Sequence, residues 1–261
     1  MKPRKRFGQH FLHDPGVLKR IVEAIAPARG DVMVEIGPGE GALTRPLLER
    51  LERLTAIEID RDLSARLTRE FPADRLTVLC ADALEFDFSA FPAGARIAGN
   101  LPYNISTPIL FHLARYADRL RDLHFMLQLE VVQRMVAQPS TPDYGRLSVT
   151  LQTRFRMAKL FKVAPGAFRP PPKVDSAVVR LVPLPEKMAC DAAVFEKIVR
   201  EAFSARRKTL RNALPLSAAD YEALGIDPML RPENLSPADY VRVARQISAR
   251  PASRSSVRSG A

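Results

Sequence analysis

Short apolar runs alternate with amphipathic segments along the first half of the chain. Segments with apolar residues at three- and four-residue spacing, which is typical of helices, lie at 17–26, 42–51 and 63–71. The apolar runs, which are typical of buried strands, lie at 32–36, 55–59, 76–80, 96–98 and 123–129. This alternation predicts an α/β, Rossmann-like domain with a mostly parallel, doubly wound sheet.

The pattern changes in the second half. Strand-like runs at 158–163 and 176–182 flank "APGAFRPPPKVD", which predicts a hairpin with a stiff, proline-rich loop. After Asp191 the strand signals stop, and helical patterns follow at 192–214, 218–224 and 237–247. The chain therefore combines the large domain with a small helical one.

These patterns predict the following division of the chain. We expect the large domain to cover 1–185, including a basic N-terminal segment at 1–14. The small helical domain would cover 186–248, and we expect the polar tail at 249–261 to be disordered.

Charge points to a polyanionic partner. The 261 residues carry a formal net charge of +11, and nucleic acid is the first candidate for the partner. No apolar run approaches the roughly 18 residues of a membrane span, and the N-terminus lacks the apolar core of a secretory signal. We therefore expect a cytoplasmic protein. Cys80 and Cys190 fit no metal or disulfide spacing, so we expect no metal site.

The run "VMVEIGPGEGALT" predicts a strand, a tight glycine turn and the start of a helix. Its spacing from Gly37 onward is G-x-G-x-G, whereas dinucleotide sites use G-x-G-x-x-G. Pro38 also removes a backbone donor that a pyrophosphate would need. The turn therefore suits a ligand that approaches bare backbone without a phosphate.

Carboxylates follow successive strands of the predicted sheet. They are Glu35, Glu58, Asp60 and Asp82. Each one alone is equally typical of a helix cap or a solvated charge, but their order at neighbouring strand ends indicates a site for a cationic ligand. S-adenosylmethionine, with its sulfonium and ammonium groups, is the cofactor we expect. Glu58 is placed to accept from ribose hydroxyls, and Asp82 from an adenine amino group.

The stretch "GNLPYNIS" follows the predicted strand at 96–98. The side-chain carbonyl of Asn100 and the backbone carbonyl of Leu101 can accept both hydrogens of an exocyclic amine, which directs its lone pair at a methyl group. Pro102 stiffens this turn, and Tyr103 can stack on a base. Alone, the motif is also typical of an ordinary turn.

Together these motifs resemble the bacterial 16S ribosomal RNA adenine N6,N6-dimethyltransferase family, which acts on the small subunit. The resemblance rests on "KRFGQHFLHD", "VEIGPGEGALT", "AIEIDRD", "CADAL", "GNLPYNIST", "YGRLSV", "FRPPPKVDSAVVRL" and "AFSARRKTLRNAL". It implies a class I methyltransferase domain. It also implies dimethylation of two adjacent adenosines in the hairpin loop near the 3′ end of 16S rRNA, with S-adenosylmethionine as donor.

The resemblance also implies site residues. His10 and Leu12 would close over the cofactor, whose site is completed by Gly37, Glu58, Asp82 and Asn100. Many relatives carry Asn at the position of His10. Phe168 is implied as a second aromatic wall for the target base, although a residue that anchors the hairpin loop to the core fits the sequence equally well.

A basic cluster near the C-terminus is the candidate RNA contact. It consists of Arg206, Arg207, Lys208 and Arg211, on a segment whose apolar stripe is Ala202, Phe203, Leu210 and Leu214. A solvated helix face is the competing interpretation. In an enzyme that holds folded RNA, such residues would contact phosphates away from the reacting base.

Three other functions compete with this one. A 23S rRNA adenine methyltransferase of the macrolide-resistance type shares the cofactor motifs and a similar "NxPY". A DNA adenine methyltransferase is disfavoured because the small C-terminal domain leaves little room for a sequence-reading module. A ribosome-assembly factor that acts mainly by binding is disfavoured by the intact motif from Asn100 to Tyr103. We expect a monomer.

Overall fold

The computed structural model describes residues 10–186 and 190–249, and these form two compact units. The first unit contains 10–137 and 154–186, and the second contains 138–153 and 190–249. The expected division at residue 185 did not include 138–153 in the helical unit, because this segment precedes the last two strands in the chain. The tail from residue 250 and the first nine residues of the N-terminal segment lie outside the described residues.

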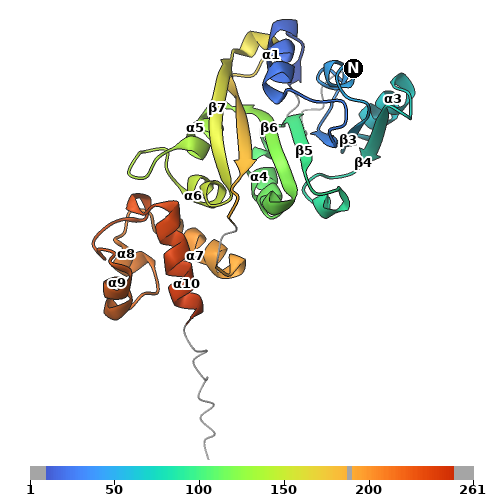
Figure 1. The fold of residues 1–261 in the computed structure, drawn as a ribbon. Helices are drawn as coiled ribbons and strands as arrows, with labels where there is room; N and C mark the ends of the chain where they lie inside the picture. Colours follow the sequence, from blue (N-terminus) through green and yellow to red (C-terminus); the bar gives the residue numbers. More distant parts are fainter. Residues whose placement is uncertain (1–9, 187–189, 250–261) are drawn as a thin grey trace, which may run out of the picture. The chain divides into compact units, whose positions relative to one another are not determined.

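A seven-stranded sheet forms the centre of the first unit (Figure 1). Its strands are β2 (Met33–Ile36), β3 (Leu54–Glu58), β4 (Leu76–Cys80), β5 (Ala95–Asn100), β6 (Leu120–Gln128), β7 (Phe155–Val163) and β9 (Ser176–Pro183). The order is β4-β3-β2-β5-β6-β9-β7, in which β2 to β6 run parallel and β9 pairs antiparallel with both β6 and β7. The predicted α/β architecture and the hairpin are thereby confirmed.

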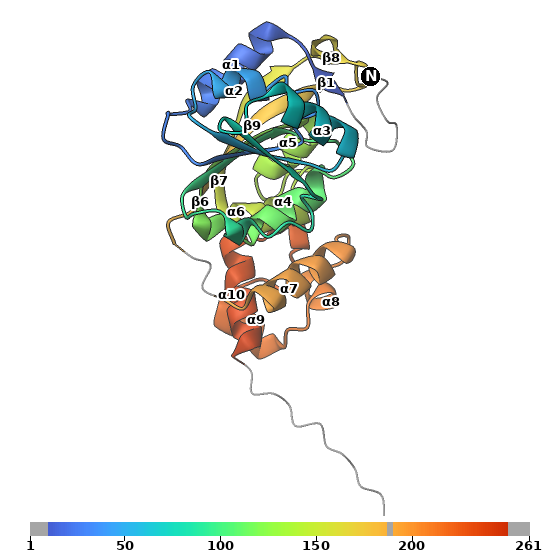
Figure 2. The ribbon, with the colours of Figure 1, turned by 90° about the vertical axis from the view of Figure 1, so that its right-hand side faces the viewer.

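Helices cover both faces of this sheet. They are α1 (Pro15–Ile25), α2 (Thr44–Leu48), α3 (Arg61–Glu70), α4 (Ser106–Ala114) and α5 (Leu129–Val136), with short 3-10 turns at Phe88–Ala90, Ala117–Arg119 and Pro165–Ala167. Helices α1 to α3 share an apolar core with one face of the sheet, and α4 and α5 pack on the other (Figure 2). Asp14 and Asp60 begin α1 and α3 because each side chain accepts backbone N–H groups of the first turn.

The central strands β2, β3, β5 and β6 are apolar runs because both of their faces are buried. Val34, Leu54 and Ile97 have no exposed side-chain surface at all. A parallel sheet covered by helices on both sides removes each residue of its central strands from water, which explains why these segments lack period-two alternation. Of the helices in the described ranges, none has the length and apolar content needed to cross a membrane.

A second, two-stranded sheet ties the N-terminal segment to the hairpin loop (Figure 2). Strand β1 (Phe11–Leu12) pairs antiparallel with β8 (Phe168–Arg169), so that Phe11 lies opposite Arg169 and Leu12 opposite Phe168. The sequence predicted neither strand, because two-residue strands have no periodicity of their own and form only through the tertiary contact.

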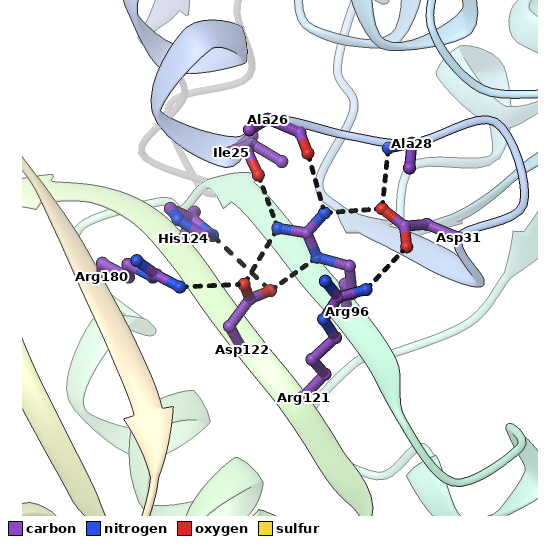
Figure 3. A network of polar contacts seen from close by, with 9 residues as sticks. All are labelled: Ile25, Ala26, Ala28, Asp31, Arg96, Arg121, Asp122, His124 and Arg180. Atoms are coloured by element: carbon purple, nitrogen blue, oxygen red, sulfur yellow. Dashed lines mark hydrogen bonds and ion pairs between the residues drawn. The ribbon is translucent and has the colours of Figure 1, made fainter.

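An ion network fixes the amino ends of the strands (Figure 3). The Arg96 guanidinium, 4% exposed, donates to both carboxylate oxygens of Asp122 and to Asp31. It also donates to the carbonyl oxygens of Ile25 and Ala26, where α1 ends. One buried cation therefore holds α1, β5 and β6 together at the edge opposite to the carboxyl ends of the strands.

The second unit is helical. It contains α6 (Arg146–Gln152), α7 (Ala192–Ser204), α8 (Leu210–Ala213), α9 (Ala218–Leu224) and α10 (Pro237–Ser248), with a 3-10 turn at Pro232–Asn234. The rings of Tyr144, Phe203 and Tyr240 contact one another in its core. The expected helix at 192–214 is wrong in one respect, because α7 ends at Ser204 and α8 begins only at Leu210.

Candidate functional site

An open pocket lies at the carboxyl ends of β2, β3, β4 and β5, where open α/β sheets bind their ligands. It encloses about 870 Å³, part of it open to solvent. The residues that line it are His10, Phe11, Ile36, Gly37, Gly39, Ile57, Glu58, Ile59, Ala81, Asp82, Ala83, Leu84, Asn100, Leu101, Pro102, Tyr103, Asn104 and Ile105.

Two glycines make this pocket possible. Gly39 adopts a φ of +58°, and a Cβ there would lie 3.1 Å from the Phe11 ring. At Gly99 a Cβ would lie 2.4 Å from the Ile36 carbonyl oxygen, which is a clash with backbone. The ends of β2 and β5 can therefore approach closely only because residue 99 has no side chain. The close approach of β2 and β5 therefore explains why the first residue of "GNLPY" is a glycine.

Glu58 organises the cofactor side of the pocket. Its Oε2 accepts the Gly39 N–H at 3.1 Å, and its Oε1 accepts the Asp60 N–H at 2.9 Å. The side chain is almost completely buried, and burial raises its pKa, against the backbone hydrogen bonds from Asp60, Gly39 and Ile59 that lower it. An ionised carboxylate has about four acceptor positions, so the group retains acceptor capacity toward the pocket.

The remaining pocket wall is apolar, with a polar end at Asp82. Ile59 is 46% exposed although it lies between the buried residues Glu58 and Asp60. Ile59 lines the pocket together with Ala83 and Leu84, and apolar groups of this kind suit a flat ring. Asp82 accepts the Leu84 N–H at 2.8 Å through Oδ1, which fixes the direction of its carboxylate.

The Asn100 to Tyr103 turn closes the pocket on the other side. Asn100 is the last residue of β5, and its Nδ2 donates to the His10 carbonyl oxygen at 3.0 Å. Below the turn, the Leu101 N–H donates to the Met126 carbonyl oxygen at 3.2 Å. The Tyr103 hydroxyl lies 2.6 Å from the Ser176 Oγ, and its ring lies 5.3 Å from the His10 ring. The turn is thus held at both ends.

The surroundings of one predicted carboxylate, Glu35, were not foreseen from the sequence. Glu35 is buried and accepts the Thr44 hydroxyl at 2.6 Å, and it borders a second open pocket that shares Phe11 and Asn100 with the first. Burial and, to a smaller extent, the nearby Glu58 carboxylate raise the Glu35 pKa, the bond from Thr44 lowers it, and the net result is a pKa of about 7. Glu35 was recognised as a strand-end carboxylate, but its complete burial has no sequence signal.

The structure brings most of the predicted residues together, with two exceptions. His10, Gly37, Glu58, Asp82 and the whole Asn100 to Tyr103 turn line the main pocket. Leu12 instead lies in the apolar core and reaches only the second pocket. Phe168 is 2% exposed in the same core and lines neither pocket. Its burial favours the alternative, an anchor for the hairpin loop, and the role as a base wall stays a prediction.

The basic cluster lies in the second unit, at the turn between α7 and α8. Arg207, Lys208 and Arg211 are exposed. Arg206 is partly buried, donates to the Pro142 carbonyl oxygen at 2.9 Å and pairs with Glu233 at 3.6 Å. Three of the four predicted contact residues therefore present their charge to solvent, and the fourth is tied to its own unit.

A family model shows the family to which the chain belongs. The model described as "Ribosomal RNA adenine dimethylase" matches residues 1–249. The chain belongs to this family. The ribosomal RNA adenine dimethylases use S-adenosylmethionine, and the chain is accordingly an S-adenosylmethionine-dependent rRNA adenine dimethyltransferase of class I architecture.

Curated relatives of this dimethylase match over nearly their whole length. The "Ribosomal RNA small subunit methyltransferase A" of Aromatoleum aromaticum is 58% identical over 253 residues, which are 95% of this chain and 96% of the relative. The protein of the same name from Nitrosospira multiformis is 60% identical over 250 residues, which are 94% of this chain and 96% of the relative.

Solved structures agree with this assignment. A dimethyladenosine transferase from Plasmodium falciparum superposes with a TM-score of 0.77 at 27% identity, over 90% of this chain and 96% of that one. The 23S rRNA methyltransferase ErmE superposes with a TM-score of 0.67 at 28% identity, over 91% of this chain and 99% of that one. The dimethylase shares its architecture with both.

The residues of the pocket fit the cofactor of a dimethylase. The site offers a buried carboxylate with remaining acceptor capacity, bare glycine backbone, and an isoleucine exposed to 46% in the same lining as a second carboxylate, Asp82. A ribose, a flat adenine ring and a cationic chain require these three kinds of surface.

Proposed function

We propose that this dimethylase methylates two adjacent adenosines in the hairpin loop near the 3′ end of 16S rRNA, on a small-subunit particle in the cytoplasm. The observation that carries the proposal is the agreement, at 58 to 60% identity over almost the whole chain, with proteins named for the small subunit. A loop is a favourable target because its bases are already partly unstacked and cost less to extrude than paired ones. We propose that the chain acts as a monomer.

Within the pocket, we assign the cofactor to the carboxylate side. Glu58 would hold the ribose hydroxyls and Asp82 the adenine amino group, while the backbone of Gly37 and Gly39 allows close approach of the aminoacyl chain. Phe11 covers Gly39, and His10 lies beside Tyr103 at the mouth. When bound, S-adenosylmethionine supplies an electrophilic methyl group on its sulfonium.

The chemistry required of the protein concerns the amine of the target base. The lone pair of an adenine amino group is delocalised into the ring, which makes it a poor nucleophile. Acceptors at the Asn100 Oδ1 and the Leu101 carbonyl oxygen would bind both amino hydrogens and hold the nitrogen in line for transfer. Because the Asn100 Nδ2 is occupied by the His10 carbonyl, the amide oxygen is the end left for the substrate.

Tyr103 provides the face that retains the extruded base. Its ring lines the pocket, and the hydrogen bond to Ser176 at the start of β9 fixes the angle of the ring. Stacking of a base on an aromatic side chain contributes about 1 to 3 kcal/mol. Pro102 keeps the two residues at a constant separation because its ring restricts the turn.

The basic cluster of the second unit would bind phosphates of the RNA. Arg207, Lys208 and Arg211 are exposed, and the net charge of +11 favours phosphate contacts throughout. Such contacts position the particle and carry no sequence information.

Mass spectrometry of rRNA tests this proposal. Small-subunit particles from a strain that lacks the protein should carry unmodified adenosines at the 3′-terminal loop, and the purified chain should dimethylate them in vitro. Methylation of 23S rRNA instead would establish the macrolide-resistance alternative. Tight binding to the particle with no methylation of either RNA would identify an assembly factor.

A further inference from the structure

His10 connects the N-terminal segment to the hairpin loop and to the Asn100 to Tyr103 turn through three separate contacts. Its Nδ1 lies 2.7 Å from the Pro170 carbonyl oxygen, which follows β8 in the hairpin loop. Its ring lies 5.3 Å from the Tyr103 ring at an interplanar angle of 31°. Its main-chain carbonyl oxygen accepts the Asn100 Nδ2 at 3.0 Å. One residue thus contacts both side chains assigned to the target adenine.

The backbone of the next residues, Leu12 and His13, is held by contacts with the hairpin loop and the apolar core. Leu12 pairs with Phe168 and both are buried in the same core, while the His13 N–H donates to the Ala167 carbonyl oxygen at 3.0 Å. The pairing ends at Phe11, so residue 10 lies beyond it. The bond from the imidazole to Pro170 is therefore the side-chain tie that holds residue 10, and its carbonyl, next to Asn100.

The hydrogen bonds determine which atoms face the substrate. A carbonyl oxygen can accept only from the amide nitrogen of Asn100, so the Asn100 Oδ1 is turned away from His10. For the same reason the His10 Nδ1 carries the proton that it shares with Pro170. The orientation of the Asn100 amide thus depends on where residue 10 is held.

We propose that His10 is a positioning residue for methyl transfer: its imidazole, bound to Pro170, holds its own carbonyl against Asn100 and its ring against Tyr103. The inference rests on the proposed function, because it gives the two contacted residues their roles on the target adenine. The sequence predicts that His10 closes over the cofactor. The inference adds a second role, because His10 also contacts Asn100 and Tyr103 of the turn that would bind the base.

Side-chain variants separate the hydrogen bond from the ring contact. His10→Asn keeps an N–H donor in place of Nδ1 but removes the ring, and His10→Phe keeps a ring but removes the donor. His10→Ala removes both. His13→Ala is the matched control, because His13 is exposed on the same segment and its backbone bond to Ala167 is retained.

We would measure kcat and KM on small-subunit particles, cofactor affinity by calorimetry, and extrusion of the target by the fluorescence of an RNA hairpin with 2-aminopurine at that position. His10→Ala should lower kcat at least about tenfold, since small misplacements of reacting groups are costly. Its affinity for S-adenosylmethionine should change less than about threefold, a difference below 1 kcal/mol. The 2-aminopurine signal should fall even without cofactor. His10→Asn should recover most of kcat, and His13→Ala should match the wild type.

Two results would overturn the inference. A His10→Ala enzyme with wild-type kcat and wild-type fluorescence would show that the side chain positions nothing. A loss confined to cofactor affinity, with kcat unchanged at saturation, would reduce His10 to a cofactor contact. The proposed function fails separately, because in that case the wild-type chain itself would not methylate the small-subunit particle.

Discussion

Among individual residues, Asn100 and Tyr103 are those to which we assign the chemistry, and experiment can separate their proposed roles. Asn100→Ala removes the acceptor for the adenine amine, and loss of one preorganised polar contact lowers kcat by about 10²- to 10³-fold. Single-turnover methylation of small-subunit particles measures this directly. Wild-type turnover in the variant would show that "GNLPY" is an ordinary turn with no catalytic role.

Tyr103 is predicted to act through its ring and not through its hydroxyl. Tyr103→Ala should reduce methyl transfer strongly while the affinity for S-adenosylmethionine stays nearly constant. Tyr103→Phe loses only the bond to Ser176 and should cost at most about 1 kcal/mol in transition-state stabilisation, the net contribution of a typical hydrogen bond. Ser176→Ala breaks the same bond from the other side and should match Tyr103→Phe in kcat/KM.

Glu35 makes stability depend on pH. Its pKa in the folded protein is about 7, above the ordinary 4.5, so the unfolded chain loses this proton first. The protonated Glu35 contributes fully to the free energy of unfolding below pH 4.5. This contribution, on the order of 3 kcal/mol, is lost as the pH rises through 7. Glu35→Gln keeps an acceptor for Thr44 and cannot ionise.

Urea unfolding of the cofactor-free protein at pH 5 and pH 8 measures this effect. The variant should be more stable relative to the wild type at pH 8 than at pH 5. An equal difference between the two proteins at both pH values would show that Glu35 titrates in its ordinary range.

Among the secondary-structure elements, the Arg96 network joins α1 to β5 and β6. Arg96→Leu would leave the buried carboxylate of Asp122 without its main partner, and breaking a buried pair in this way costs about 3 to 5 kcal/mol. Arg121, whose side chain is 61% exposed, also binds Asp31, and it is the control. Arg121→Ala should cost about 0 to 1 kcal/mol because solvent screens an exposed pair.

Chemical denaturation of both variants compares the two costs. Similar free energies of unfolding for Arg96→Leu and Arg121→Ala would mean that the network contributes nothing beyond surface pairing. Activity at low denaturant should survive in Arg121→Ala, since the network lies at the strand ends opposite to the pocket.

The secondary-structure elements show how far sequence patterns predict structure. Strands β2 to β6 fall within a few residues of the apolar runs. For β2, β3, β5 and β6 the reason is burial on both faces, which requires an apolar residue at almost every position. The β1 to β8 pairing and the packing of 138–153 with the C-terminal helices were not predicted, since both depend on contacts between distant segments. The apolar spacing of 192–214 continued through residues 205–209, where the helix in fact stops.

The predicted site shows the same division. Glu58, Asp82 and Asn100 follow strand ends, so topology alone brings them to one pocket. The burial of Phe168 was not predicted, because it depends on the pairing with Leu12, a residue far away in the sequence. The hydrogen bond between Asn100 and the His10 carbonyl spans ninety positions of sequence and has no local signal.

For the whole molecule, the net charge of +11 raises the question of whether the basic cluster is a specific RNA contact or part of a general field. The structure shows which residues of the basic cluster to replace in order to answer this question. Arg206 is bound to Pro142 and Glu233, so its replacement would disturb the second unit as well as any RNA contact. The exposed set of Arg207, Lys208 and Arg211 is the cleaner target.

Replacement of these three residues by Ala should weaken binding to the small-subunit particle and flatten its dependence on salt. Each lost phosphate contact lowers the slope of log affinity against log salt by about 0.7 to 0.9. Arg50, Arg69 and Arg115 of the first unit are also exposed, and their triple Ala variant removes the same charge. A larger loss of slope in the first variant than in the second identifies a local contact. Equal losses would assign the effect to net charge alone, and cofactor affinity should be unchanged in both variants.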